Sequence, residues 1–123
     1  MLIKPSRALA LLLVLPVLAN AASYNCSGSV DQVTVDPNGE VNASFTFDGG
    51  GMSWQAVCSL NENPAFNVTP AACKGILATL LLANQTRKHV RMWFDNDTNG
   101  SCSAPQWQKL RQSGWYWGPS LQG

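Results

Sequence analysis

The sequence predicts a small exported domain that is mainly β, with one helix and two disulfides. Three observations support this prediction. Apolar and polar residues alternate in two segments, 41–48 and 52–60, with the period of half-buried strands. One segment, 69–84, has helical spacing instead. All four cysteines follow an apolar N-terminal leader, and an even number of cysteines in an exported chain indicates disulfides.

The leader, residues 1–21, has the layout of a secretory signal peptide. Two basic residues precede an apolar run over 8–18, and small residues at 19–21 provide a cleavage site after Ala21. The run is shorter than the ~20 residues that a transmembrane helix needs, and no later segment is long enough to span a membrane. Residues 22–123 are then expected to form a single domain, secreted or periplasmic.

The charged residues of the mature chain argue against several functions. Without the leader, six basic and seven acidic side chains remain, so no basic stripe is available for nucleic acid. His89 is the single histidine, and no nucleophile motif accompanies it. Glu40 and Glu62 are isolated in turn or loop settings, which does not suit paired-carboxylate catalysis. We therefore expect a non-enzymatic protein without a cofactor or structural metal.

A hairpin is expected to open the domain. A first strand is predicted at 29–35, and residues 36–39, Asp-Pro-Asn-Gly, follow as its turn. Proline presets the second turn position, and Asn-Gly accepts positive φ. The second strand, 41–48, has the clearest alternation in the chain, and three glycines at 49–51 are expected to end it.

The third strand, 52–60, continues the alternation and leads into the helix. Its period places Trp54 in the core and leaves Val57 as the one residue out of phase. After a polar loop, Thr69 is a good N-cap and Pro70 suits the first helical position. The helix is expected to end near residue 84. Its buried face is expected to consist of Cys73, Ile76, Leu77, Leu80, Leu81 and Asn84.

Two more strands are expected after the helix. The first of them, 89–94, has two distinct faces. These faces consist of Val90, Met92 and Phe94 on the apolar side and His89, Arg91 and Trp93 on the other. A polar loop follows at 95–105, then a helical turn at 106–112 and a last strand at 115–117.

The resulting order is three strands, a helix and two strands. In one small domain this order is typical of a five-stranded oligonucleotide/oligosaccharide-binding (OB) barrel, with the helix between strands three and four. Such a barrel brings the start of strand one close to the end of strand four. It also brings the end of strand three close to the start of the helix. The order therefore predicts the disulfides Cys26–Cys102 and Cys58–Cys73.

The loop after the fourth strand contains the first half of a calcium-binding pattern. Asp95, Asp97 and Asn99 offer oxygen ligands at alternate positions, and Gly100 allows a sharp turn. The twelfth position is Gln106 instead of glutamate, and a strand instead of a helix precedes the loop. An ordinary polar loop, rich in the same residue types, is the better interpretation. Calcium is the alternative.

The aromatic residues of the last two strands are the strongest functional lead. If the apolar face of 89–94 points to the core, Arg91 and Trp93 face solvent. Trp115, Tyr116 and Trp117 of the last strand are then expected to extend the same surface. A flat aromatic surface beside polar groups suits a sugar ring or a partner protein. These five residues are the candidate binding residues, and packing under the loop or a subunit interface is the structural alternative.

The segment Val57-Cys58-Ser59-Leu60, followed by Cys73-Lys74-Gly75-Ile76-Leu77, resembles two groups of proteins when taken with the layout of strands, helix and cysteines. One group is small exported bacterial proteins with two disulfides and no assigned function. The other, more distant, is the binding subunit of AB5-type toxins such as subtilase cytotoxin. This resemblance implies a barrel with one helix, a pentameric assembly and recognition of cell-surface glycans. No sugar-contacting residue carries over to a position in this sequence.

Together these features favour an exported, non-enzymatic binding module whose ligand is expected to be a glycan. A protein-interaction or assembly subunit, including a homo-oligomer, is the alternative. A small hydrolase or inhibitor is less favoured, because the sequence contains no catalytic signature.

Overall fold

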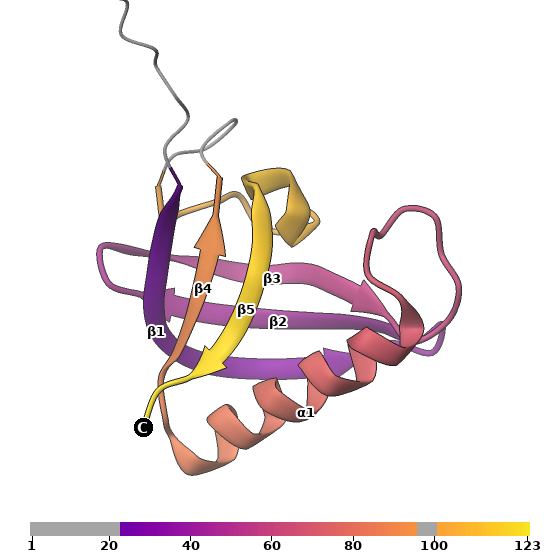
Figure 1. Ribbon diagram of the computed structural model, residues 1–123, viewed down its shortest axis with the longest axis horizontal. Coiled ribbons are helices and arrows are strands. Elements are labelled where there is room, and N and C mark those ends of the chain that lie inside the picture. Colours follow the sequence, from indigo (N-terminus) through magenta and orange to yellow (C-terminus); the bar gives the residue numbers. More distant parts are fainter. Residues whose placement is uncertain (1–22, 96–100) are drawn as a thin grey trace, which may run out of the picture.

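Five antiparallel strands form one sheet in the order β3-β2-β1-β4-β5, and one long helix packs against it (Figure 1). The computed structural model describes residues 23–95 and 101–123, so the expected signal peptide, 1–21, lies outside the described residues. The elements are β1 (Tyr24–Val35), β2 (Glu40–Phe47), β3 (Gly50–Ser59), α1 (Pro70–Thr86), β4 (Val90–Phe94), the 3-10 helix η1 (Leu110–Ser113) and β5 (Trp115–Leu121). The prediction of a mainly β fold with one helix is confirmed.

The sheet bends along β1, which belongs to both of its halves. The N-terminal part of β1 pairs with β4 and the C-terminal part with β2, and Gly28 pairs with both neighbours. Figure 1 shows β1 curving from beside β4 and β5 into the layer of β2 and β3. The strand begins at Tyr24 and not at residue 29. The sequence pattern missed these first residues because Cys26 and Gly28, which are buried, do not give a hydrophobic alternation.

The turn between β2 and β3 is tighter than the sequence predicts. It consists of Asp48 and Gly49, whose φ is 84°. Gly50 and Gly51 therefore belong to β3 and pair with β2, whereas the sequence pattern placed them in a break between strands. At Gly50 an added Cβ would collide with the loop that carries Cys102, so this loop packs directly on the end of the hairpin.

The alternation of β3 changes phase at Trp54. This residue has a φ of 48°, the register with β2 shifts beside it, and its backbone N–H donates to Ser44 Oγ (2.8 Å). After the shift, Gln55 and Val57 are buried, which explains why Val57 is out of phase in the sequence. The prediction that Trp54 lies in the core is wrong, because the bulge leaves its side chain only half-buried.

The start of α1 is as predicted. Thr69 Oγ1 accepts a hydrogen bond from the Ala72 N–H (3.1 Å), and Pro70 occupies the first helical position. The helix runs two residues further than expected and ends at Thr86, because Arg87 adopts a left-handed conformation (φ 60°) and caps it.

Replacing Thr69 by alanine is expected to lower the free energy of unfolding by about 1 kcal/mol, because the Ala72 N–H loses its acceptor. Chemical denaturation measures this difference. Thr79→Ala is the matched control, since the Thr79 hydroxyl only donates back to the Gly75 carbonyl within the helix. We expect no loss of stability in the control, because alanine has the higher helix propensity. Equal losses in both variants would contradict the capping role.

The core lies between the curved sheet and α1. Two pairs of aromatic rings stack there: Phe45 on Phe47, with ring centroids 5.1 Å apart, and Tyr24 on Phe94, with centroids 5.4 Å apart. Phe47 and Phe94 meet edge to face, with centroids 6.5 Å apart.

Of the six helix residues expected in the core, Cys73 and Leu80 are buried and Ile76, Leu77 and Asn84 are half-buried, whereas Leu81 is 43% exposed. Ala83, which the sequence pattern does not predict in the core, is buried.

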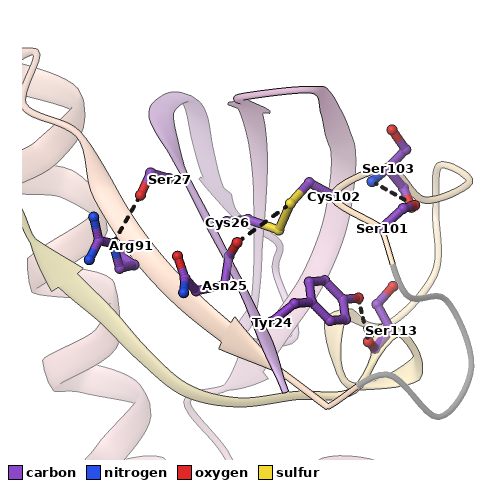
Figure 2. The surroundings of a disulfide bond; sticks show 9 residues. All are labelled: Tyr24, Asn25, Cys26, Ser27, Arg91, Ser101, Cys102, Ser103 and Ser113. Atoms are coloured by element: carbon purple, nitrogen blue, oxygen red, sulfur yellow. Dashed lines mark hydrogen bonds between the residues drawn. A yellow bond between two sulfur atoms is a disulfide. The ribbon is translucent and has the colours of Figure 1, made fainter. Parts of the chain in front are cut away.

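Both predicted disulfides are present. Cys58–Cys73 joins the end of β3 to the first turn of α1, with the two Cα atoms 5.7 Å apart. Cys26–Cys102 joins β1 to the loop after β4, with the Cα atoms 5.8 Å apart (Figure 2). The pairing predicted from the order of the elements is therefore confirmed.

The sheet is open between its two edge strands, β3 and β5. Part of the gap is occupied by the segment 104–113, which forms parallel bridges to β3 at Ala104 and Lys109 and ends in η1. The expected helical turn at 106–112 is thus shorter and begins later. β5 is longer than expected and continues through Gly118 and Pro119.

Candidate functional site

The outer face of β1, β4 and β5 carries three of the five candidate residues. The alternation predicted for β4 is correct, since Val90, Met92 and Phe94 are buried and Arg91 and Trp93 alternate with them. Strand pairing extends this outer face in two rows. We define the Trp93–Trp117 face by these two rows, which are Asn25, Trp93 and Trp117, and Ser27, Arg91 and Ser120.

The two tryptophans of this face are direct cross-strand neighbours. Trp93 on β4 pairs with Trp117 on β5, between two shifts of the register, so the two indoles project from adjacent strands. Trp93 is half-buried, whereas 67% of the Trp117 surface is exposed. The pair therefore presents a broad apolar surface to solvent, with the side chain of Asn25 on its other flank.

Arg91 places a positive charge beside the two indoles. Its Nε donates to Ser27 Oγ (3.0 Å), which fixes the guanidinium against β1 (Figure 2). Figure 2 shows Ser27 and Asn25 on the side of β1 that faces Arg91, and Cys26 on the other. Within residues 23–95 and 101–123, the two Nη groups of Arg91 make no hydrogen bond. Four N–H donors are thus available next to the tryptophans.

The other two candidates have different positions. Trp115 is 8% exposed and belongs to the core, and its indole Nε1 donates to the Trp117 carbonyl (3.2 Å). Tyr116 is 52% exposed, and its hydroxyl donates to Ser23 Oγ (3.2 Å). The register between β4 and β5 shifts at this point, which lets Trp115 point inward although Trp117 points outward. The sequence pattern thus predicts one surface for all three residues of β5. In the structure Trp115 belongs to the core, whereas Tyr116 and Trp117 are exposed.

A groove runs beside β5, between this strand and the start of α1. Its volume is about 630 Å³, and its walls include Tyr116, Trp117 and Pro119 from β5, and Thr69 and Ile76 from the helix side. Trp117 borders both this groove and the Trp93–Trp117 face. Ligand contacts with Trp117 can therefore extend from the open face into the groove.

The calcium alternative falls mostly outside the described residues, because Asp97 and Asn99 lie in the segment 96–100. Asp95 is half-buried, and its backbone N–H donates to the Gly114 carbonyl (2.9 Å). In the described part of the chain, no group of three or more His, Cys, Asp or Glu side chains is arranged to hold a metal ion.

A second pair of tryptophans was not identified from the sequence. Trp54 on β3 and Trp107 in the segment 104–113 stack in parallel, with ring centroids 5.7 Å apart and an angle of 3° between the planes. Trp107 is 70% exposed. Its isolated position among polar residues gives no periodic signal, and the sequence pattern predicts that Trp54, on which it stacks, lies in the core.

Both of these tryptophans have backbone conformations that side chains of this size rarely adopt. Their φ angles are 48° for Trp54 and 63° for Trp107. Such left-handed conformations cost about 1–3 kcal/mol each, whereas one aromatic stack contributes about 0.5–1.5 kcal/mol. This stacking energy comes in addition to the apolar area that the two rings bury, and together they oppose the conformational cost. A left-handed backbone at both positions is nevertheless unusual for tryptophan.

A comparison of the chain with protein-family models, with curated proteins and with solved structures finds no match. Among the described residues, no helix has both the length and the apolar character needed to cross a membrane. The geometry of the surface is therefore the basis for the function that we propose.

Proposed function

We propose that this protein is an exported, non-enzymatic binding module that takes a glycan on the Trp93–Trp117 face. The observation that carries the proposal is the cross-strand pair Trp93–Trp117 beside the Nη groups of Arg91, which make no hydrogen bond to the residues that the structure describes. A sugar ring has a flat face of C–H groups and a rim of hydroxyls. An exposed indole with polar groups around it matches both features.

The residues of this face have complementary roles in the proposal. The exposed Trp117 ring packs against the C–H face of the sugar, and Trp93 supports it from the neighbouring strand. The Nη groups of Arg91 donate to sugar hydroxyls, and the side-chain amide of Asn25 both donates and accepts. Because Arg91 is held by Ser27 Oγ, little side-chain entropy is lost when it binds.

The Cys26–Cys102 disulfide supports this arrangement from the opposite side of β1. Cys26 lies between Asn25 and Ser27 and is buried, so the bond holds the strand from which both polar side chains project. The candidate residues thus stand on strands and not on loops, which favours a pre-formed site.

For the architecture we infer an OB-fold-like barrel, in which the segment 104–113 occupies the place of direct pairing between β3 and β5. The strand order β3-β2-β1-β4-β5, with α1 between β3 and β4 in the chain, supports this inference. Two disulfides fit an oxidising compartment, which supports a secreted or periplasmic location.

Trp117→Ala is expected to weaken glycan binding at least ten-fold, because the variant lacks the exposed ring of the pair. A glycan array selects the best ligand for the folded wild-type protein, and calorimetry compares the variants on that ligand. Leu82→Ala is the control, since Leu82 is similarly exposed (50%) on the helix. We expect it to bind as the wild type does.

Two outcomes of this experiment would contradict the proposal. One is a folded wild-type protein that binds no glycan on the array. The other is an equal affinity of Trp117→Ala and the wild type.

An assembly subunit is the second candidate, because apolar side chains are exposed along β5. Tyr116, Trp117 and Leu121 are 52%, 67% and 36% exposed. Light scattering distinguishes the two functions. A wild-type oligomer that dissociates in Trp117→Ala would favour assembly, whereas a monomeric wild type favours ligand binding.

A further inference from the structure

We propose that the stacked pair Trp54–Trp107 is a second binding site, which takes a neutral sugar ring. Trp54 covers one face of the Trp107 ring in a parallel stack. Since 70% of the Trp107 side chain is exposed, its other face is open to solvent. A sugar ring packed on that open face would extend the stack. This site lies on β3 and the segment 104–113, shares no residue with the Trp93–Trp117 face and does not depend on it.

The pair is held in place before any ligand binds. The Trp107 N–H donates to the Trp54 carbonyl (3.2 Å), so the two residues are joined through the backbone as well as by their rings. The buried side chain of Gln55 adds a second link, because its Nε2 donates to the carbonyls of Ser53 and Pro105, each at 2.9 Å. The surface is therefore pre-organised, which lowers the entropy cost of binding.

The backbone at both positions points to a role beyond stability. At a φ of 48° or 63°, asparagine or glycine would fit with less strain than tryptophan. Strained residues of this kind are typical of ligand-binding sites. A ring-binding role gives a reason for tryptophan at these two positions.

The surroundings indicate a neutral ligand. β3 contains no charged residue, and neither does the stretch 101–108. The two charges of the segment 104–113 are both directed to the loop before α1. The Lys109 ammonium lies 6.0 Å from the centroid of the Phe66 ring, and Arg111 Nη1 donates to the Ala65 carbonyl (2.8 Å). A phosphate or carboxylate would therefore lack a counter-charge supplied by these segments. The exposed side chains of Ser53 and Gln106 offer a hydroxyl and an amide, which are the groups that hydrogen-bond sugar hydroxyls.

Nuclear magnetic resonance tests this site separately from the first. The five tryptophans each give one indole N–H signal, and single Trp→Phe variants assign them. The probes are neutral hexasaccharides of glucose, mannose and N-acetylglucosamine, titrated into the full protein. We expect at least one of them to shift the Trp54 and Trp107 signals. If no hexasaccharide shifts these two signals, the proposal is overturned, whether or not those of Trp93 and Trp117 respond.

Trp107→Asn separates binding from stability. Asparagine tolerates the left-handed conformation, so the variant is expected to unfold at the same or a higher denaturant concentration than the wild type. It is also expected to bind the hexasaccharide at least ten-fold more weakly. Trp107→Tyr retains a flat ring and should recover most of the affinity. Unchanged hexasaccharide binding by folded Trp107→Asn would overturn the proposal.

Discussion

Replacing Cys26 and Cys102 together by alanine should lower the free energy of unfolding by about 4–5 kcal/mol. The two cysteines are 76 residues apart in the chain, so the disulfide closes most of the domain into one loop. In the chain-entropy model, a cross-link of this span removes that much conformational freedom from the unfolded state. A domain of this size has a total stability of about 5–15 kcal/mol, so the loss is a large fraction of it.

Urea denaturation and calorimetry measure this effect. For a domain of about 100 residues, a loss of 4–5 kcal/mol corresponds to a fall in Tm of about 20 °C or more. The matched variant is the double replacement of Cys58 and Cys73. Their disulfide closes a span of only 15 residues. Its chain-entropy loss is about 3 kcal/mol. We expect the Cys26/Cys102 variant to be the less stable of the two. The reverse order would show that local packing, and not loop length, governs the contribution of the disulfides.

Gly28→Ala is expected to destabilise the fold by about 3 kcal/mol or more, at the upper end of overpacking costs. Gly28 is the residue of β1 that pairs with both β2 and β4, at the bend of the sheet. A Cβ at this position would collide with the Thr46 carbonyl oxygen and lie 2.7 Å from Phe47 Cα. Both are backbone atoms of β2, so relief requires the strands to separate. Denaturant unfolding measures the loss.

Gly75→Ala provides the control with the opposite sign. Gly75 lies within α1, and a Cβ there would meet no atom within 4 Å. Because glycine is a poor helix former, this variant is expected to be more stable by about 0.5–1 kcal/mol. The same chemical change should therefore weaken one position and strengthen the other. A loss of less than 1 kcal/mol for Gly28→Ala would contradict the close contact at the bend.

Several parts of the fold could be predicted because their signals are local. The period of residues 41–48, the Thr69-Pro70 start of the helix and the two faces of 89–94 each depend on neighbours within a few residues. The disulfide pairing also followed, since the order of strands and helix brings the correct cysteines together. The strand and helix patterns required no knowledge of distant contacts, whereas the disulfide pairing depended on the expected barrel topology.

The candidate site was predicted only in part. Arg91, Trp93 and Trp117 share one face because an alternating strand pattern fixes two of them and strand pairing adds the third. The sequence pattern predicts Trp115 on the same surface, but it is a core residue. A shift of register between β4 and β5 decides which way the Trp115 side chain points, and the sequence of β5 alone does not predict that shift.

The sequence by itself determined the types and order of the elements, the cysteine pairing and the outward face of β4. Tertiary structure alone decided the phase change at Trp54, the stack of Trp107 on it and the open edge between β3 and β5. The physical reason is the distance along the chain over which each feature is decided. A strand or helix period follows from side chains a few residues apart. The bulge at Trp54 forms where the segment 104–113 bonds to β3, about 50 residues away, and such contacts exist only once the chain has folded.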